Sequence, residues 1–170
     1  MRNVILLSLL LIFATCLPAV ADDRAVPPKI DEAALVAWAS GIATETLTYD
    51  FEDYEKVFDH AKRNYTAEGW QGLQASLEHS GLQANVIKYQ QTVYTQQNST
   101  SPPRIETRGT KDGVSEWIVS VPIVQTVVAG NKTATRLVTI TMTIVEGPPR
   151  ALLPTLTIVH WEEYPPAVHH

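Results

Sequence analysis

Cysteine is nearly absent from this sequence, which has one, Cys16, among 170 residues. Cys16 lies in an N-terminal apolar segment that we expect to be removed on export. The exported chain would then have no disulfide and no cysteine-based metal site, even in an oxidising compartment. The alternative is a lipoprotein anchored through Cys16, although the preceding Thr15 is a poor match to the small residue expected before a lipidated cysteine.

Clustered positive charge is also missing. The chain has 13 Lys and Arg against 18 Asp and Glu, which gives a net charge of −5. The basic residues are scattered, and no run of them alternates with aromatic residues. Proteins that bind nucleic acid group their Lys and Arg side chains to neutralise phosphates. The composition therefore predicts no nucleic-acid partner.

Familiar catalytic motifs are absent as well. The chain has no Gly-x-Ser-x-Gly, no phosphate-binding glycine loop and no His-Glu-x-x-His. We interpret His169 and His170 as a tail, because no further metal ligands lie near them. The sequence thus predicts no catalytic residue, no cofactor and no metal site. For acid–base chemistry the least unsuitable candidates are Glu106, Glu116 and His160, and no spacing brings them together.

The first 21 residues have the pattern of a secretory signal peptide. An apolar run over residues 4–13 is followed by Ala19 and Ala21, small residues at the two positions that signal peptidase reads, and then by Asp22. An uncleaved anchor is the alternative, since residues 4–21 reach the lower length limit for crossing a bilayer. We predict cleavage after Ala21 and export from the cytoplasm.

The rest of the chain is predicted to form one domain. Residues 22–30, with two prolines, indicate an extended leader, and residues 164–170 a tail. Residues 31–163 are enough for a single core, since chains of about 150 residues bury roughly 70% of their unfolded surface.

The first half of this domain has helical periodicity. Asp31 is a predicted N-cap for a helix with Leu35, Trp38 and Ile42 on one face. A second helix is predicted to start at Asp50 and to carry aromatic residues at three- and four-residue spacing. Thr66 is predicted to cap a third helix, which closes at residues 80–81. The aromatic residues at this spacing predict a core and not a cofactor pocket.

From Ala84 the period changes to two, which predicts strands. The expected strands and connections are an alternating segment from residue 84 to 93, a loop at 96–103, and strands at 104–110, 116–128, 137–145 and 156–161. Pro122 implies an edge position or a bulge, because proline cannot donate to a ladder. Residues 147–149 are expected to break the strand before them. Helices followed by antiparallel strands predict an α+β fold, with a curved sheet of about four strands packed against the N-terminal helices.

Several short motifs together resemble the DotI/IcmL family of type IVB secretion systems, which is related to the conjugation protein TraM. The match spans residues 37–158. Its residues, in chain order, are Trp38, Tyr49, Asp50, Tyr54, Thr66, Gly69, Trp70, Trp117 and Pro122. The resemblance implies an NTF2-like periplasmic domain that acts as a scaffold component and not as an enzyme, in secretion, virulence or conjugation. Its expected partners are proteins of the secretion-system envelope complex, with a homo-oligomer possible.

The matched residues have a structural interpretation. Asp50 and Thr66 would cap helices, and Gly69 would let Trp70 lie close to a neighbouring backbone. In the family, a cytoplasmic segment and a transmembrane helix precede this domain, whereas here only residues 1–3 precede the apolar run. We therefore expect a core or accessory component that is free in the periplasm, or secreted. The alternative is a small-molecule-binding or isomerase-type protein with a pocket between sheet and helices, because fold alone does not determine function.

Overall fold

The computed structural model describes residues 30–150 and 153–164. The predicted signal peptide, most of the leader and most of the tail lie outside this part of the chain. None of the helices within it is both long and apolar enough to cross a membrane. The helical elements are α1 (Glu32–Thr46), α2 (Tyr54–Ala61), the 3-10 turn η1 (Lys62–Asn64), α3 (Ala67–Ser80) and α4 (Leu82–Lys88). The strands are β1 (Tyr49–Asp50), β2 (Thr92–Gln97), β3 (Arg104–Lys111), β4 (Val114–Ala129), β5 (Lys132–Arg150) and β6 (Leu153–Tyr164).

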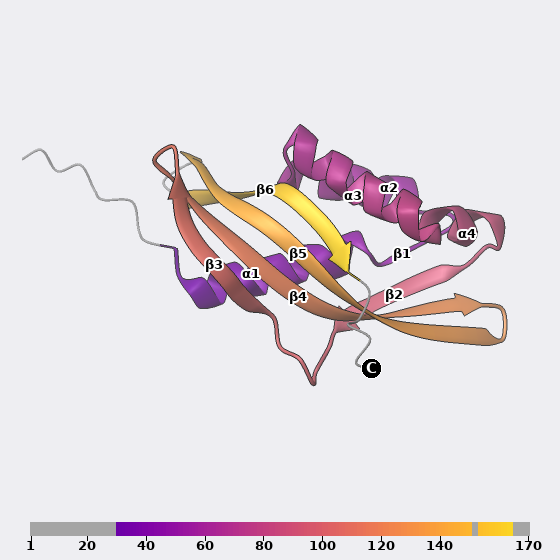
Figure 1. The fold of residues 1–170 in the computed structure, drawn as a ribbon. Coiled ribbons are helices and arrows are strands. Elements are labelled where there is room, and N and C mark those ends of the chain that lie inside the picture. Colours follow the sequence, from indigo (N-terminus) through magenta and orange to yellow (C-terminus); the bar gives the residue numbers. More distant parts are fainter. Residues whose placement is uncertain (1–29, 151–152, 165–170) are drawn as a thin grey trace, which may run out of the picture.

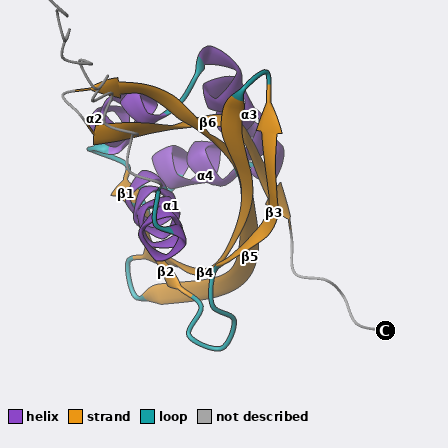
Figure 2. Cartoon of the chain, turned by 90° about the vertical axis from the view of Figure 1, so that its left-hand side faces the viewer, coloured by secondary structure: helices purple, strands orange, loops and turns teal. Residues whose placement is uncertain are grey.

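The strands form one antiparallel sheet that curls around α1 (Figures 1 and 2). Its order is β1-β2-β4-β5-β6. β3 pairs with the first half of β4, on the same edge where β2 pairs with its second half. The inner face of β4 and one face of α1 are fully buried against each other, through Val119, Val121, Leu35 and Ala39. The α+β class and the curved sheet are confirmed. The described residues form six strands, whereas the predicted sheet had about four. The five segments with strand periodicity all contribute a strand, and the sixth, β1, has two residues and is too short to show a period.

Two predicted helix caps are confirmed. The Asp31 carboxylate accepts a hydrogen bond from the Ala33 amide at 3.3 Å and begins α1. The Thr66 hydroxyl accepts one from the Gly69 amide at 3.1 Å and begins α3. Gly81 ends α3 in the left-handed conformation, with φ +63°, which glycine adopts without steric cost.

The predicted start of the second helix at Asp50 is wrong. Asp50 belongs to β1, where it pairs with Thr92, and α2 begins at Tyr54. The Asp50 carboxylate accepts from the amides of Glu52 and Asp53 at 2.8 and 2.9 Å and holds the turn between β1 and α2. An aspartate favours helix caps and such turns alike, so the residue type could not distinguish them.

The strand predicted from Ala84 is also wrong in its first half. Residues 82–88 form α4, which follows Gly81 directly. Leu82 and Val86, four residues apart, are buried, whereas Ile87 is 42% exposed. The buried residues are thus spaced as in a helix and not as in the strand that the alternation predicts. The strand begins only at Thr92, and Val93 is its buried residue.

Pro122 lies on an inner strand, in contrast to the predicted edge position or bulge. On one side it pairs with Thr139 of β5. On the other side, pairing with β3 ends at Ser120 and pairing with β2 begins at Ile123. The Pro122 carbonyl accepts from the Asn98 amide at 3.0 Å, so its nitrogen faces that same side. The missing N–H therefore falls at the gap between two partner strands.

The alternation in β5 is confirmed, and its predicted end is not. Val138, Ile140, Met142 and Ile144 are buried, and the threonines between them are half-buried on the opposite face. β5 nevertheless continues past Gly147 to residue 150 and pairs with β6. The register becomes irregular after Gly147, which accommodates two prolines that have no N–H to donate.

Candidate functional site

Two aromatic residues of the predicted motifs, Tyr49 and Trp70, meet Phe58, Tyr65 and Trp161 in one cluster. The rings of Tyr49 and Phe58 lie 5.1 Å apart, those of Phe58 and Trp70 6.3 Å, and those of Tyr65 and Trp70 5.6 Å, all edge to face. Tyr65 also contacts Trp161 of β6, at 5.9 Å between ring centroids. Edge-to-face pairs are favourable beyond their buried area. The cluster joins β1, α2, α3 and β6, which are distant in sequence.

Helix α3 lies directly against the backbone of β6. A Cβ atom added to Gly69 would overlap the Ile158 carbonyl, and one added to Gly72 would lie 2.8 Å from the Trp161 carbonyl oxygen. The Thr66 amide also donates to the Ile158 carbonyl at 2.9 Å. The close approach is made by Gly69 itself, against the backbone of β6, whereas the prediction assigned the approach to Trp70.

The other motif residues lie at the margin of the core. Trp38 and Trp117 are half-buried against it, on α1 and β4, and Tyr54 packs its ring against Phe58 at 6.2 Å. With the aromatic cluster, they place most of the motif inside the fold and not on one exposed surface.

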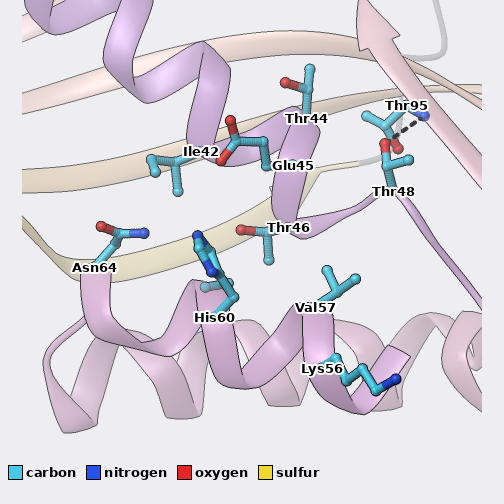
Figure 3. A pocket seen from close by; sticks show the side chains of 11 residues that line it. Ile42, Thr44, Glu45, Thr46, Thr48, Lys56, Val57, His60, Asn64 and Thr95 are labelled. Carbon is cyan, nitrogen blue, oxygen red and sulfur yellow. Dashed lines mark hydrogen bonds between the residues drawn. The ribbon is translucent and has the colours of Figure 1, made fainter. Parts of the chain in front are cut away.

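A cleft of about 580 Å³ opens between the C-terminal half of α1 and helix α2, beside β2 (Figure 3). Its floor is apolar and consists of Ile42, Val57 and Ala61. Its polar and charged lining comprises Thr44, Glu45, Thr46, Thr48, Lys56, His60, Asn64 and Thr95. None of these residues was predicted as a site. The spaced threonines near the end of α1 were the one sequence signal, and they gave no reason to expect a cleft.

The rim of this cleft is held by hydrogen bonds between its elements. The Thr95 amide donates to the Thr48 hydroxyl at 3.1 Å, and the Thr95 hydroxyl donates to the Leu47 carbonyl at 2.6 Å. These bonds hold the end of α1 against β2. Nδ1 of His60 lies 2.6 Å from an Arg63 guanidinium nitrogen and therefore accepts a hydrogen bond. The lining has no nucleophile paired with a base, so it suits binding better than covalent chemistry.

The three candidates for acid–base chemistry do not converge. Glu106 is exposed and pairs with Arg104 at 2.7 Å, and His160 is exposed, 3.7 Å from Glu162. Glu116 shares an open surface groove with His160, and Glu106 does not line it. No buried acid or base faces an enclosed cavity at these positions. The isomerase-type alternative therefore has no support from the residues proposed for it.

A polar network joins side chains of β4, β5 and β6. No sequence pattern indicated it. The Arg136 guanidinium donates through Nε to the Gln125 side-chain carbonyl at 2.7 Å and lies 3.1 Å from the Glu163 carboxylate. Burial raises the pKa of the Glu163 carboxyl, and the Arg136 charge opposes this shift. Burial also raises the pKa of the Tyr49 phenol, which therefore stays neutral. Within residues 30–150 and 153–164, no group of three or more His, Cys, Asp or Glu side chains could hold a metal ion.

Comparison with solved structures shows the same fold in several secretion proteins. The periplasmic domain of DotI is 24% identical with a TM-score of 0.72, and the alignment covers 81% of this chain and 97% of that one. A periplasmic fragment of TraM is 16% identical with a TM-score of 0.73, covering 81% and 99%. An IcmL-like type IV secretion protein from Legionella pneumophila is 20% identical with a TM-score of 0.68, covering 83% and 97%. At these identities the likeness establishes the fold. A search of curated proteins finds no match.

The family comparison covers most of the chain. The model for the type IVB secretion system DotI/IcmL proteins, described as an inner-membrane complex component, matches residues 24–162. This range includes every motif residue placed above. The chain therefore belongs to the DotI/IcmL family of type IVB secretion system components.

Proposed function

We propose that this protein is a non-enzymatic periplasmic interaction domain, a component or accessory of a type IVB secretion or conjugation apparatus. The observation that carries the proposal is the family match over residues 24–162, together with a fold similar to the periplasmic domain of DotI. The predicted cleavage between Ala21 and Asp22 supports a location in the periplasm. The aromatic cluster and Gly69 build the fold, so the surfaces for partners lie elsewhere.

The cleft between α1 and α2 is the proposed contact surface. Its apolar lining offers a place for one apolar side chain of a partner. The hydroxyl of the exposed Thr48 accepts from the Thr95 amide and can donate to a carbonyl of the partner's main chain. The opposite charges of Glu45 and Lys56 on the rim leave no strong field of either sign, which favours a partner segment of low net charge. Interfaces commonly have such an arrangement of an apolar centre and a polar rim.

Affinity purification from detergent-solubilised cell envelopes tests both statements. The tagged protein is expected to recover inner-membrane or core-complex components of the secretion system, identified by mass spectrometry. Val57→Glu would place a charge on the cleft floor and is expected to reduce this recovery at least about tenfold. Val114→Glu is the matched control, because Val114 is 40% exposed and lies outside the cleft.

Circular dichroism of each variant shows whether the fold is intact. Recovery of the wild-type protein alone, in the soluble fraction, would refute the proposed association. Equal recovery by the two folded variants would refute the role of the cleft.

A further inference from the structure

The first part of β5 has a partner strand on one side only. Within the described residues, positions 132–138 pair with β4, whereas β6 pairs with β5 only from Thr139 onward. Figure 1 shows the hairpin of β4 and β5 extending past the end of β6. We call this free segment, residues 132–138, the β5 edge. Most of its residues are exposed, namely Lys132, Thr133, Ala134, Thr135 and Leu137.

The backbone groups of alternate residues face the β5 edge. Pro122 of β4 turns its carbonyl away from β5. Thr139 lies opposite Pro122, so its backbone groups point away from β4 in the same way. The register between the two strands is unbroken from there to the turn. Thr133, Thr135 and Leu137 therefore present their N–H and C=O groups to the β5 edge.

There is room for a further strand along this edge. A groove of about 1070 Å³ separates its second half from the end of α3. The groove is lined by Leu137 and Val138 on the side of β5 and by His79 and Ser80 on the side of the helix. Residues 132–135, in the first half of the edge, are all exposed.

The devices that usually keep a strand edge from pairing are weak here. Inward-pointing charges, prolines and bulges are the common ones. The Arg136 guanidinium donates to Gln125 at 2.7 Å and lies 3.1 Å from the Glu163 carboxylate, so its charge is balanced within the domain. The segment contains no proline, and its register with β4 has no bulge. The remaining charge, Lys132, lies at one end of the edge, beside the turn.

The sequence that follows β6 is unsuited to pair with this edge. Tyr164 pairs with Thr139, so the residue that would face Leu137 in a longer β6 is Pro166. Proline has no N–H to donate to a ladder, and Pro165 precedes it. A strand that fits the β5 edge is therefore to be sought in another molecule.

We propose that the β5 edge binds the same edge of a second copy of this chain, antiparallel and about a two-fold axis at Thr135. Thr135 is the midpoint of residues 132–138 and faces the edge, so this register pairs the whole segment. Thr133 then lies opposite Leu137 of the second copy, and the opposed pairs exchange about six hydrogen bonds. A two-fold interface requires a surface that is complementary to itself in this way.

The side chains suit this register. On the outer face each Thr135 lies beside Thr135 of the second copy, which is a favourable cross-strand pair. On the inner face Arg136 lies opposite Ala134, whose small side chain leaves space, and no like charges are directly opposed. Leu137 and Tyr164, 47% and 45% exposed, lie on the outer face beside the edge and would be partly covered. The interface is separate from the α1–α2 cleft and goes beyond the proposed function.

Sedimentation velocity of the purified full chain tests the association. The wild type is expected to be a dimer at micromolar concentration. Thr135→Pro is expected to raise the dissociation constant at least about tenfold, because it removes an edge N–H from both copies and leaves the β4 ladder intact. Thr135→Val is the matched control, since it keeps this N–H and the branched side chain. A monomeric wild type, or equal dissociation constants for the two variants, would overturn the proposal.

Disulfide cross-linking tests the register in a Cys16→Ser background and does not depend on the proline variant. Thr135→Cys is expected to form a covalent dimer, since directly opposed residues have Cα atoms about 5.5 Å apart. Thr133→Cys and Leu137→Cys are expected to cross-link when mixed, and neither by itself. Thr141→Cys is the control, because it lies on the same face of β5 where β6 already pairs.

The outcomes separate the dimer from the proposed function. Absence of a Thr135→Cys dimer, or a Thr133→Cys dimer formed without Leu137→Cys, would overturn the two-fold register. A monomeric protein that still recovers secretion components from envelopes would overturn the dimer and leave the proposed function intact. A dimer that recovers none would refute the function and leave the β5 edge interface standing.

Discussion

Replacing Gly69 with alanine tests whether α3 lies as close to β6 as the structure shows. In an isolated helix this change is stabilising by up to about 1 kcal/mol, since alanine is the better helix former. Here the new methyl group would overlap the Ile158 carbonyl, which belongs to the backbone of a paired strand and cannot rotate away. Overpacking of this kind costs about 1–3 kcal/mol, and backbone contact favours the upper end.

The expected net loss in the free energy of unfolding is therefore about 2 kcal/mol, and for a chain of this length the melting temperature falls by roughly 4–8 °C. Gly41→Ala is the matched control. Gly41 also lies within a helix, and an added Cβ would meet nothing within 4 Å. We expect it to raise stability by up to about 1 kcal/mol.

Urea unfolding followed by circular dichroism measures both variants. The two substitutions are chemically identical, so helix propensity predicts the same sign for both and only the contact with β6 predicts opposite signs. A Gly69→Ala variant as stable as the wild type would refute the close approach of α3 to β6.

Three further predictions concern the core and the polar network. Trp161→Ala is expected to lower the free energy of unfolding by about 3–5 kcal/mol, and Trp70→Ala by distinctly less, because Trp161 is fully buried and Trp70 only partly. Urea unfolding measures both losses, and equal losses would contradict this ranking. Asp50→Ala is expected to cost about 1.5–3 kcal/mol through loss of two hydrogen bonds to its carboxylate, and Asp50→Asn, which keeps an acceptor, distinctly less. Burial raises the pKa of Glu163 above its ordinary 4.5, so the folded state holds that proton more tightly than the unfolded chain. Its contribution to stability is thus present below pH 4.5 and is lost as the pH rises through the raised pKa. Arg136 and His79 lower the pKa of this carboxyl, and the Glu163 charge in turn raises the pKa of Tyr49. Glu163→Gln is expected to flatten the pH dependence in unfolding measurements from about pH 4 to 7, and an unchanged profile would refute this expectation.

Much of the local structure could be predicted from the sequence. The caps at Asp31 and Thr66 were predictable because each is a hydrogen bond to an amide two or three residues away. The buried alternation from Val138 to Ile144 was predictable because successive side chains of a strand point to opposite faces. The ordered motifs likewise indicated the family, which the match over residues 24–162 establishes.

Other features depended on contacts between distant segments. α4 is a helix because Leu82 and Val86 find a core to bury against, and a seven-residue segment by itself is too short for its period to be decisive. Pro122 is accommodated on an inner strand because two other strands happen to end beside it. Neither fact can be read from the residues nearby.

The same division applies to the candidate sites. Local patterns in the sequence were enough for the α+β class, the start of α1, both ends of α3, the family and the absence of familiar catalytic motifs. Only the tertiary structure brought Ile42, Val57 and Thr95 around one cleft and, among the described residues, paired β6 with β5 only from Thr139 onward. The physical reason is that a binding surface consists of side chains and backbone groups from separate elements. Their meeting is decided by how the helices and the curved sheet pack, which no local spacing encodes.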